Sequence, residues 1–291
     1  MTHRQARFLF GSLLLAFLVA IGWLDHARGT AIATPWFAAL LGCVGLIEFR
    51  RMAGDRLPRH VGSALVLGGG AVLLLTVLAS DRGSQSHRGS QTLFLMLAVG
   101  PVLAVLAPCL SLMRLRWRSG VQRGDLDVAG IVAIGVFVTV VPVAALIATV
   151  HLPSGVLFGV VVVLGCKLND IGGYLIGSAM GKRKLCPGIS PNKTWEGSVG
   201  GFALGVAGTF LMCLLLPGVS DRVEWWQSVL LGIALAITTQ AGDLFESLLK
   251  RAAGVKDSGA LIPAFGGVLD LVDSLIFAAP VGYAMGLAWL V

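Results

Sequence analysis

The stretch "LIFAAPVGYAMGLAWLV", residues 275–291, contains no charged side chain. An α-helix needs about 20 such apolar residues to cross the roughly 30 Å hydrocarbon core of a lipid bilayer. The residues directly before it, "GVLDLVDS" at 267–274, contain Asp270 and Asp273. The sequence therefore predicts a membrane helix that begins with two carboxylates.

The rest of the chain is similarly apolar. Of its 291 residues 56% are hydrophobic and only 13% are charged, and its mean hydropathy is +0.86. We predict an all-α fold, a polytopic integral membrane protein with about nine transmembrane helices, because the short alternating segments of a membrane barrel are absent. The apolar segments lie near residues 8–24, 31–49, 61–79, 92–113, 128–150, 156–180, 198–217, 226–242 and 270–291. The first is longer than the core of a signal peptide, and we interpret it as a retained helix.

Basic residues indicate the orientation of the chain. Seventeen of the 22 Lys and Arg residues fall in one set of alternate connections, and four fall in the other. Basic loops collect on the cytoplasmic side of a membrane. We therefore expect a protein of the cytoplasmic (inner) membrane, with its N-terminus and its motif loops in the cytoplasm. The basic connections lie near residues 1–7, 50–59, 114–123, 182–193 and 250–256.

The formal net charge of +7 follows from this topology. No basic-aromatic pattern accompanies it, so we expect no nucleic-acid partner. Polar residues inside apolar segments are concentrated in the second half. We therefore interpret residues 1–127 as a scaffold of N-terminal transmembrane helices, and residues 128–291 as a C-terminal transmembrane catalytic region.

Ionisable residues within membrane segments are costly and are functional candidates by default. Lys167 and Asp170 share one helix face, and so do Asp243, Glu246, Ser247 and Lys250. Two structural alternatives stay open: Lys167 and Asp170 could form an ion pair that joins two helices, and the second group could be a solvated helix end.

Asp270 and Asp273 are one helical turn apart, and two carboxylates that close repel each other unless a cation lies between them. Mg²⁺ is usually held by one or two carboxylates together with substrate phosphates. Lysines and a Gly-rich turn, here Gly266-Gly267, can bind the remaining phosphate oxygens. These residue types together indicate a site for a divalent cation and a phosphate chain.

Three stretches carry a resemblance to a known family. They are "SLLKRAAGVKDSGALIPAFGGVLDLVD" at 247–273, "ISPNKTWEG" at 189–197 and "DIGGY" at 170–174. Their composition, spacing and order resemble those of phosphatidate cytidylyltransferases, also called CDP-diacylglycerol synthases, over roughly residues 165–275. The resemblance implies transfer of CMP from CTP to phosphatidate, giving CDP-diacylglycerol and pyrophosphate, with Mg²⁺ as cofactor. CTP, phosphatidate and membrane lipid are then the expected partners, and a homodimer is possible.

The resemblance also assigns roles to residues. Asp243 and Asp270 are expected to hold Mg²⁺ with support from Asp273 and Asp257. The expected catalytic residues are Asp243, Asp270, Asp273, Lys256 and Asp257. The expected substrate-binding residues, which bind phosphate or shape the inner loop and its polar cavity, are Lys167, Asp170, Ser190, Lys193, Thr194, Trp195, Glu196, Ser247, Lys250, Arg251, Gly266 and Gly267. Trp195 could equally stack on cytosine or anchor the chain at the membrane interface.

The chain departs from the family pattern at three positions. Phe265 replaces a His, Leu271 replaces an Arg and Asn192 replaces a Lys, while every carboxylate is retained. The second pKa of a phosphomonoester is about 6, so phosphatidate is largely dianionic at neutral pH and needs no general base. Loss of the His is therefore compatible with catalysis. Two alternatives stay open: a cation-coupled membrane transporter, although we find no repeat of two halves, and a degenerate lipid-binding member of the family.

Overall fold

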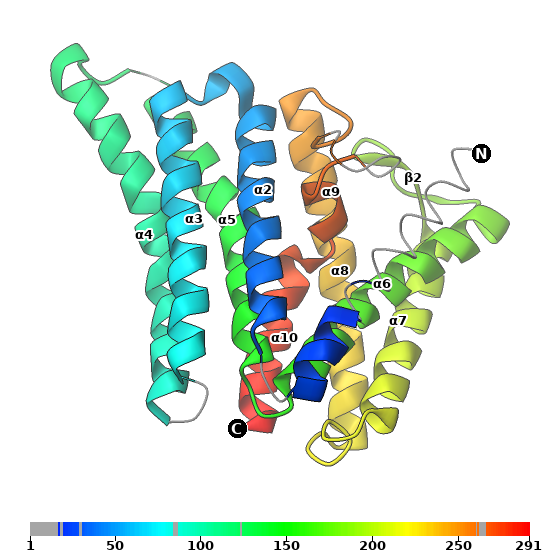
Figure 1. The fold of residues 1–291 in the computed structure, drawn as a ribbon. Coiled ribbons are helices and arrows are strands. Elements are labelled where there is room, and N and C mark those ends of the chain that lie inside the picture. The colour runs from blue at the N-terminus through cyan, green and yellow to red at the C-terminus, as the bar shows by residue number, and fades with distance from the viewer. Residues whose placement is uncertain are drawn as a thin grey trace.

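The computed structural model describes residues 17, 20–28, 31–83, 87–122, 124–259, 261 and 266–291. Most of the first expected membrane segment, residues 8–24, lies outside this part of the chain, as does Phe265. The described residues form long helices that run between the two ends of the molecule (Figure 1). The helices are α2 (Ala33–Ala53), α3 (Arg59–Gly83), α4 (His87–Ser119), α5 (Asp125–Val150), α6 (Gly155–Met180), α7 (Trp195–Leu215), α8 (Trp225–Ala253), α9 (Leu269–Val272) and α10 (Leu275–Leu290).

Six of the described helices, α3 to α8, are long and apolar enough to cross a membrane. Helix α10 is apolar but has only 16 residues. The described part of the chain is thus mainly helical and has helices suited to a membrane, as the hydropathy predicts. The expected count of about nine spans stays a prediction.

One element departs from the all-α expectation. Strands β1 (Lys184–Cys186) and β2 (Ser190–Thr194) form an antiparallel hairpin between α6 and α7. The short turn between them contains Pro187 and Gly188, residues typical of turns. The hairpin leads directly into α7, because the Thr194 hydroxyl caps that helix by accepting a hydrogen bond from the Gly197 N–H at 3.2 Å.

Two apolar cores hold the helices together. The first core is formed mainly by α2 to α5, and the second mainly by α6 to α8 with parts of α5 and α10. Leu269 of α9 and Ile276 of α10 belong to the first core, whereas Leu275 and Ala278 belong to the second. Helices α9 and α10 therefore lie between the two halves, as Figure 1 shows.

Helices α6 and α7 approach each other closely through glycines. A Cβ atom on Gly201 would lie 2.6 Å from the Asn169 carbonyl oxygen, and one on Gly172 would lie 2.9 Å from the Gly200 carbonyl oxygen. Real side chains do not fit in such gaps. Small residues at helix interfaces are how membrane helices gain packing, since lipid supplies no hydrophobic drive between them.

The last expected segment, 270–291, is not one continuous helix. It is broken at Asp273 and Ser274 into α9 and α10, and α8 lies directly against this break. A Cβ atom on Gly242 of α8 would lie only 2.6 Å from the Asp273 carbonyl oxygen. The break brings the Asp270–Asp273 region next to the carboxylates of α8.

Candidate functional site

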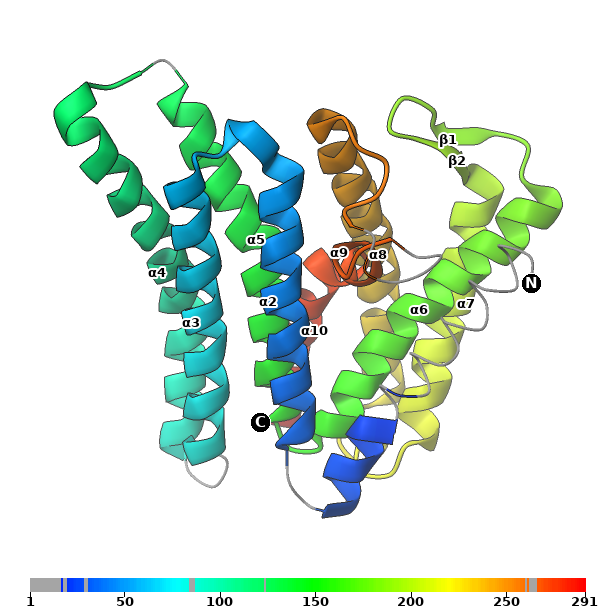
Figure 2. The ribbon, with the colours of Figure 1, turned by 45° about the horizontal axis from the view of Figure 1, so that its top comes forward.

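The polar connections gather at one end of the molecule. The turn after α2, the β-hairpin and the loop after α8 lie at the upper end in Figures 1 and 2, while the α7–α8 turn lies at the opposite end. This arrangement matches the alternation of basic loops in the sequence. It brings the stretches 170–174, 189–197 and 247–273 into one region of the fold.

The first carboxylate cluster consists of Lys167, Asp170, Lys193, Asp243 and Asp273. Lys193 of β2 forms an ion pair with Asp243 of α8 at 2.6 Å, and Lys167 forms one with Asp170 at 3.3 Å on α6. Asp273 interacts electrostatically with Asp243, Asp170 and Lys167. The cluster therefore joins three carboxylates to two lysines, which come from α6, β2, α8 and the break between α9 and α10.

Lys167 also accounts for the break between α9 and α10. Its ammonium group donates hydrogen bonds to the Leu271 carbonyl and to the Ser274 hydroxyl, both at 2.9 Å. A broken helix leaves carbonyl groups without their helical partners, and in a membrane protein these must be satisfied internally. The Lys167–Asp170 ion pair of the structural alternative is present, but it lies within α6. Lys167 joins α6 to the break through its two other hydrogen bonds.

The second carboxylate cluster consists of Glu246, Lys250, Ser258, Gly267 and Asp270. Lys250 of α8 bridges Glu246 and Asp270, with 2.6 Å between the Lys250 ammonium and Asp270. Asp270 Oδ2 also accepts from the Ser258 N–H at 2.8 Å, the Ser258 hydroxyl at 2.7 Å and the Gly267 N–H at 2.7 Å. Asp270 thus closes the loop between α8 and α9.

Glu246 is fully buried, so the interpretation of the α8 carboxylates as a solvated helix end is wrong for this residue. Each cluster contains a lysine beside its carboxylates: Lys250 pairs with Asp270, and Lys167 interacts with Asp273. The divalent cation expected between Asp270 and Asp273 stays a prediction. The sequence placed Lys167 with Asp170, and Lys250 with Asp243 and Glu246, but it gave no sign that Lys193 pairs with Asp243, because these two residues lie on separate elements.

The other predicted site residues lie around these clusters. Glu196 accepts hydrogen bonds from the Lys182 and Arg183 N–H groups and so holds the start of the hairpin. Trp195 is exposed at the start of α7, which leaves both of its predicted roles open. Three residues are exposed beyond the second cluster, namely Arg251, Lys256 and Asp257, and three are half-buried, namely Ser190, Ser247 and Gly266.

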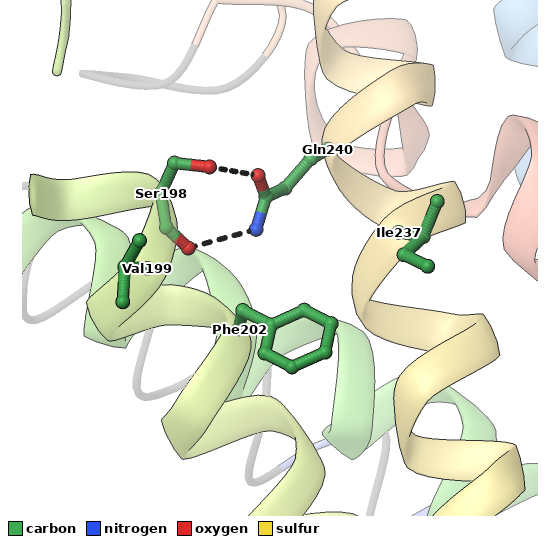
Figure 3. Close-up of a pocket in the computed structure, with 5 residues that line it drawn as sticks. All are labelled: Ser198, Val199, Phe202, Ile237 and Gln240. Atoms are coloured by element: carbon green, nitrogen blue, oxygen red, sulfur yellow. Dashed lines mark hydrogen bonds between the residues drawn. The ribbon is translucent and has the colours of Figure 1, made fainter. Parts of the chain in front are cut away.

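A pocket of about 260 Å³ lies between α7 and α8 (Figure 3). Its apolar wall is formed by Val199, Phe202 and Ile237, and Val199 and Ile237 are exposed at the protein surface. Gln240 forms its polar end: the amide donates to the Ser198 carbonyl at 3.0 Å and accepts from the Ser198 hydroxyl. Gln240 precedes Asp243 by one helical turn, and sequence reasoning did not select it.

The residues fit the expected divalent cation in type. No group of three or more His, Cys, Asp or Glu side chains is placed to hold a metal ion within the described ranges. Mg²⁺ does not require such a cage, since it commonly binds one or two carboxylates and completes its shell with water and substrate phosphates. Among the described residues, Asp243 binds Lys193 through one oxygen and Asp273 accepts from the Ser274 N–H through one oxygen, which leaves the second oxygen of each for a cation. Both oxygens of Asp270 already accept hydrogen bonds.

The fold and this site define a mainly helical membrane protein whose C-terminal half carries paired carboxylates and lysines. A model of the cytidylyltransferase family matches residues 5–289, and the chain therefore belongs to this family.

Curated relatives align with part of the chain. A phosphatidate cytidylyltransferase of Brucella suis biovar 1 (strain 1330) is 47% identical over 118 residues, which are 40% of this chain and 42% of the relative. A phosphatidate cytidylyltransferase of Mycobacterium leprae (strain TN) is 41% identical over 117 residues, 40% of this chain and 36% of the relative. The chain thus aligns with less than half the length of these relatives.

Proposed function

We propose that this protein is a phosphatidate cytidylyltransferase. Membership of the cytidylyltransferase family over nearly the whole chain carries the proposal, and the relatives' names supply the lipid substrate. In the proposed reaction, a phosphate oxygen of phosphatidate attacks the α-phosphorus of CTP. The bond between that phosphorus and the oxygen bridging to the β-phosphorus breaks, and pyrophosphate leaves with CDP-diacylglycerol as the lipid product.

The residues of the two clusters suit this reaction. Phosphoryl transfer depends on positioning and on neutralising negative charge rather than on covalent help from the protein. Lys193 and Lys250 are half-buried or more and already bind carboxylates, so they can exchange these for phosphate oxygens. Lys256 and Arg251 are exposed beyond the second cluster and can receive the triphosphate.

We propose Asp243, Asp270 and Asp273 as the residues that hold Mg²⁺, with Asp243 and Asp273 the better placed. When bound, the ion would neutralise the phosphate charge that develops as pyrophosphate leaves. The protein itself holds Asp243 and Asp273 in place. The Lys167 hydrogen bonds fix the break beside Asp273, and the close approach of Gly242 holds α8, which carries Asp243, against this break.

The pocket between α7 and α8 suits the lipid substrate. It is apolar where it opens at the surface of the helices and polar at Gln240, one turn from Asp243. An acyl chain has the matching chemistry, because its methylene groups pack against apolar walls while its headgroup needs polar partners. We therefore assign this pocket to an acyl chain of phosphatidate.

We further propose that the protein spans the cytoplasmic membrane about nine times. The hairpin and the loop after α8 would then lie on the cytoplasmic side. The gathering of basic connections at one end of the described helices supports this orientation. CTP is made and used in the cytoplasm, so the proposed site would then face its substrate.

A direct assay tests the activity. The purified protein in lipid nanodiscs is mixed with radiolabelled CTP, phosphatidate and Mg²⁺, and the lipid fraction is analysed for labelled CDP-diacylglycerol. Diacylglycerol, which lacks the attacking phosphate, serves as the control acceptor. Absence of labelled lipid with phosphatidate, or equal labelling with diacylglycerol, would contradict the proposal.

A further inference from the structure

A carboxylate of the N-terminal half reaches the loop between α8 and α9. Glu48 lies in α2, and its side chain is buried, with 3% of its surface exposed. Its Oε2 atom accepts a hydrogen bond from the Leu269 N–H at 2.9 Å, across 221 positions of the sequence. Helices α2 and α9 lie side by side in both views of the fold (Figures 1 and 2).

Two glycines of the loop leave room for this carboxylate. A Cβ atom on Gly259 would lie 2.7 Å from Glu48 Oε1, and one on Gly267 would overlap Glu48 Oε2. Real Cβ atoms do not come this close to an oxygen. The two limbs of the loop, one at 258–259 and the other at 266–267, therefore converge on the Glu48 side chain.

Asp270 binds the same two limbs. It accepts hydrogen bonds from the Ser258 N–H at 2.8 Å and from the Gly267 N–H at 2.7 Å. The loop is thus held by two carboxylates, Asp270 from its own sequence and Glu48 from the other half of the molecule. A second link from the N-terminal half starts in the turn after α2, where the Arg56 guanidinium donates a hydrogen bond to the Ala252 carbonyl at the end of α8, at 2.8 Å.

The Glu48 carboxylate does not serve helix packing alone. Its Oε1 atom is buried and has no hydrogen-bond partner among the described residues. A buried polar atom without a partner destabilises a protein relative to an apolar group of similar shape. The hydrogen bond from the Leu269 N–H and the contacts with both limbs of the loop offset this destabilisation.

We propose that Glu48 is a positioning residue for the transfer reaction. It holds the α8–α9 loop, and with it Lys256, Asp257 and Asp270, in a fixed position relative to α8. The residue acts through the loop and touches no substrate. The proposal rests on the proposed cytidylyl transfer for its kinetic consequence. The anchoring of the loop can be measured without that activity.

The kinetic test compares Glu48→Leu, Glu48→Gln and the matched control Thr76→Val. Thr76 is also buried in the N-terminal half, but its hydroxyl donates to the Val72 carbonyl within its own helix, α3. Since displacement of a site by about 1 Å costs up to about 100-fold in rate, Glu48→Leu should lower kcat at least about tenfold, with the KM for phosphatidate changed less than about twofold. Glu48→Gln keeps an oxygen acceptor for the Leu269 N–H and should restore kcat to within about threefold of wild type. Thr76→Val should match the wild type.

The second test is limited trypsin digestion in nanodiscs, with mass spectrometry of the fragment that ends at the exposed Lys256. Cleavage in a folded protein follows local opening, so loss of the anchor should speed the cut at Lys256 by about tenfold in Glu48→Leu but not in Thr76→Val. Gly259→Ala, which places a methyl group against Glu48 Oε1, should do the same and replaces Glu48→Leu if that variant does not fold.

The outcomes separate the two proposals. Slower turnover and faster cleavage in Glu48→Leu, with Glu48→Gln close to wild type, support the positioning role. Wild-type kcat or a wild-type cleavage rate in Glu48→Leu overturns it, as does an equal loss in Glu48→Gln. If the wild-type protein transfers no label to phosphatidate, the proposed function fails, and the cleavage rates alone decide whether Glu48 anchors the loop.

Discussion

At the scale of single residues, lysines determine how the carboxylates of this site are tolerated. Two aspartates one turn apart repel each other in isolation, but Lys250 binds Asp270 and Lys167 lies near Asp273. Removing one member of a buried pair leaves the other charge uncompensated, which costs more than the pair contributes. Because the aspartates have different partners, we expect their substitutions to differ in their effects on stability and activity.

Asp243→Asn should abolish transfer to phosphatidate while leaving the fold intact. Asp243 is 30% exposed and pairs with Lys193, so the neutral amide is tolerated, but the proposed cation loses a ligand. A bound metal contributes several kcal/mol and each 1.36 kcal/mol is tenfold, so the rate should fall by at least about 100-fold. Asp221→Asn, at an exposed position in the α7–α8 turn, is the control for the measurement of labelled lipid. Mg²⁺-dependent turnover near the wild-type level in Asp243→Asn would contradict the assignment.

Asp270→Asn should abolish transfer and also destabilise the protein. The Asp270 carboxylate accepts from Lys250, Ser258 and Gly267, and an amide can replace only part of these bonds. Loss of a buried charge-assisted bond costs about 1–3 kcal/mol, so the thermal unfolding midpoint in detergent should fall. The hydrogen bonds to Asp270 thus outweigh the repulsion from Asp273 that the sequence predicts. The Asp273 carboxylate accepts a hydrogen bond from the N–H of its neighbour Ser274, so Asp273→Asn should unfold close to the wild-type temperature. Equal unfolding midpoints for Asp270→Asn and Asp273→Asn would contradict the stabilising role of Asp270.

At the scale of elements, glycines determine which helices can meet. Helix α6 lies along α7 with backbone against backbone, and this brings the hairpin that carries Lys193 next to α8. A glycine also allows close approach at the break between α9 and α10, because Gly242 lets α8 come near the Asp273 carbonyl. Site geometry is therefore set by helix packing some distance from the site itself.

Gly201→Ala should destabilise the bundle, although alanine is the better helix former. The new methyl group would meet the Asn169 carbonyl at 2.6 Å, and overpacking of this kind costs about 1–3 kcal/mol. Gly130→Ala in α5 is the matched control: nothing lies within 4 Å of its new methyl group, so it should be neutral or stabilising by up to about 1 kcal/mol. Thermal unfolding of the two variants in detergent provides the comparison, and equal midpoints would contradict close packing of α6 on α7.

At the scale of the whole molecule, hydropathy predicts the described helices because a membrane helix satisfies its own backbone hydrogen bonds. The same reasoning missed features that depend on partners distant in sequence. The break at Ser274 is stabilised by Lys167 of α6, and Glu48 lies in an apolar run with no local sign of its contact to Leu269. The hairpin from Lys184 to Thr194 was also missed, since its strands are too short to show a pattern. The carboxylates could be selected because charge inside an apolar segment is itself a signal.

The topology of the whole molecule leads to a final prediction. Lys184, in the hairpin, and Arg222, in the α7–α8 turn, are exposed and lie at opposite ends of the described helices. We expect a cysteine at position 184 to react only from the cytoplasmic side, and one at position 222 only from the outer side, because basic loops stay in the cytoplasm. The measurement is labelling of intact cells with a membrane-impermeant maleimide, before and after permeabilisation, in a variant whose five native cysteines are replaced by alanine. Asp55→Cys, in the turn after α2, should label from the same side as Lys184→Cys. Labelling of positions 184 and 222 from one side would show that α7 does not cross the membrane, and the site would then lack a defined cytoplasmic face.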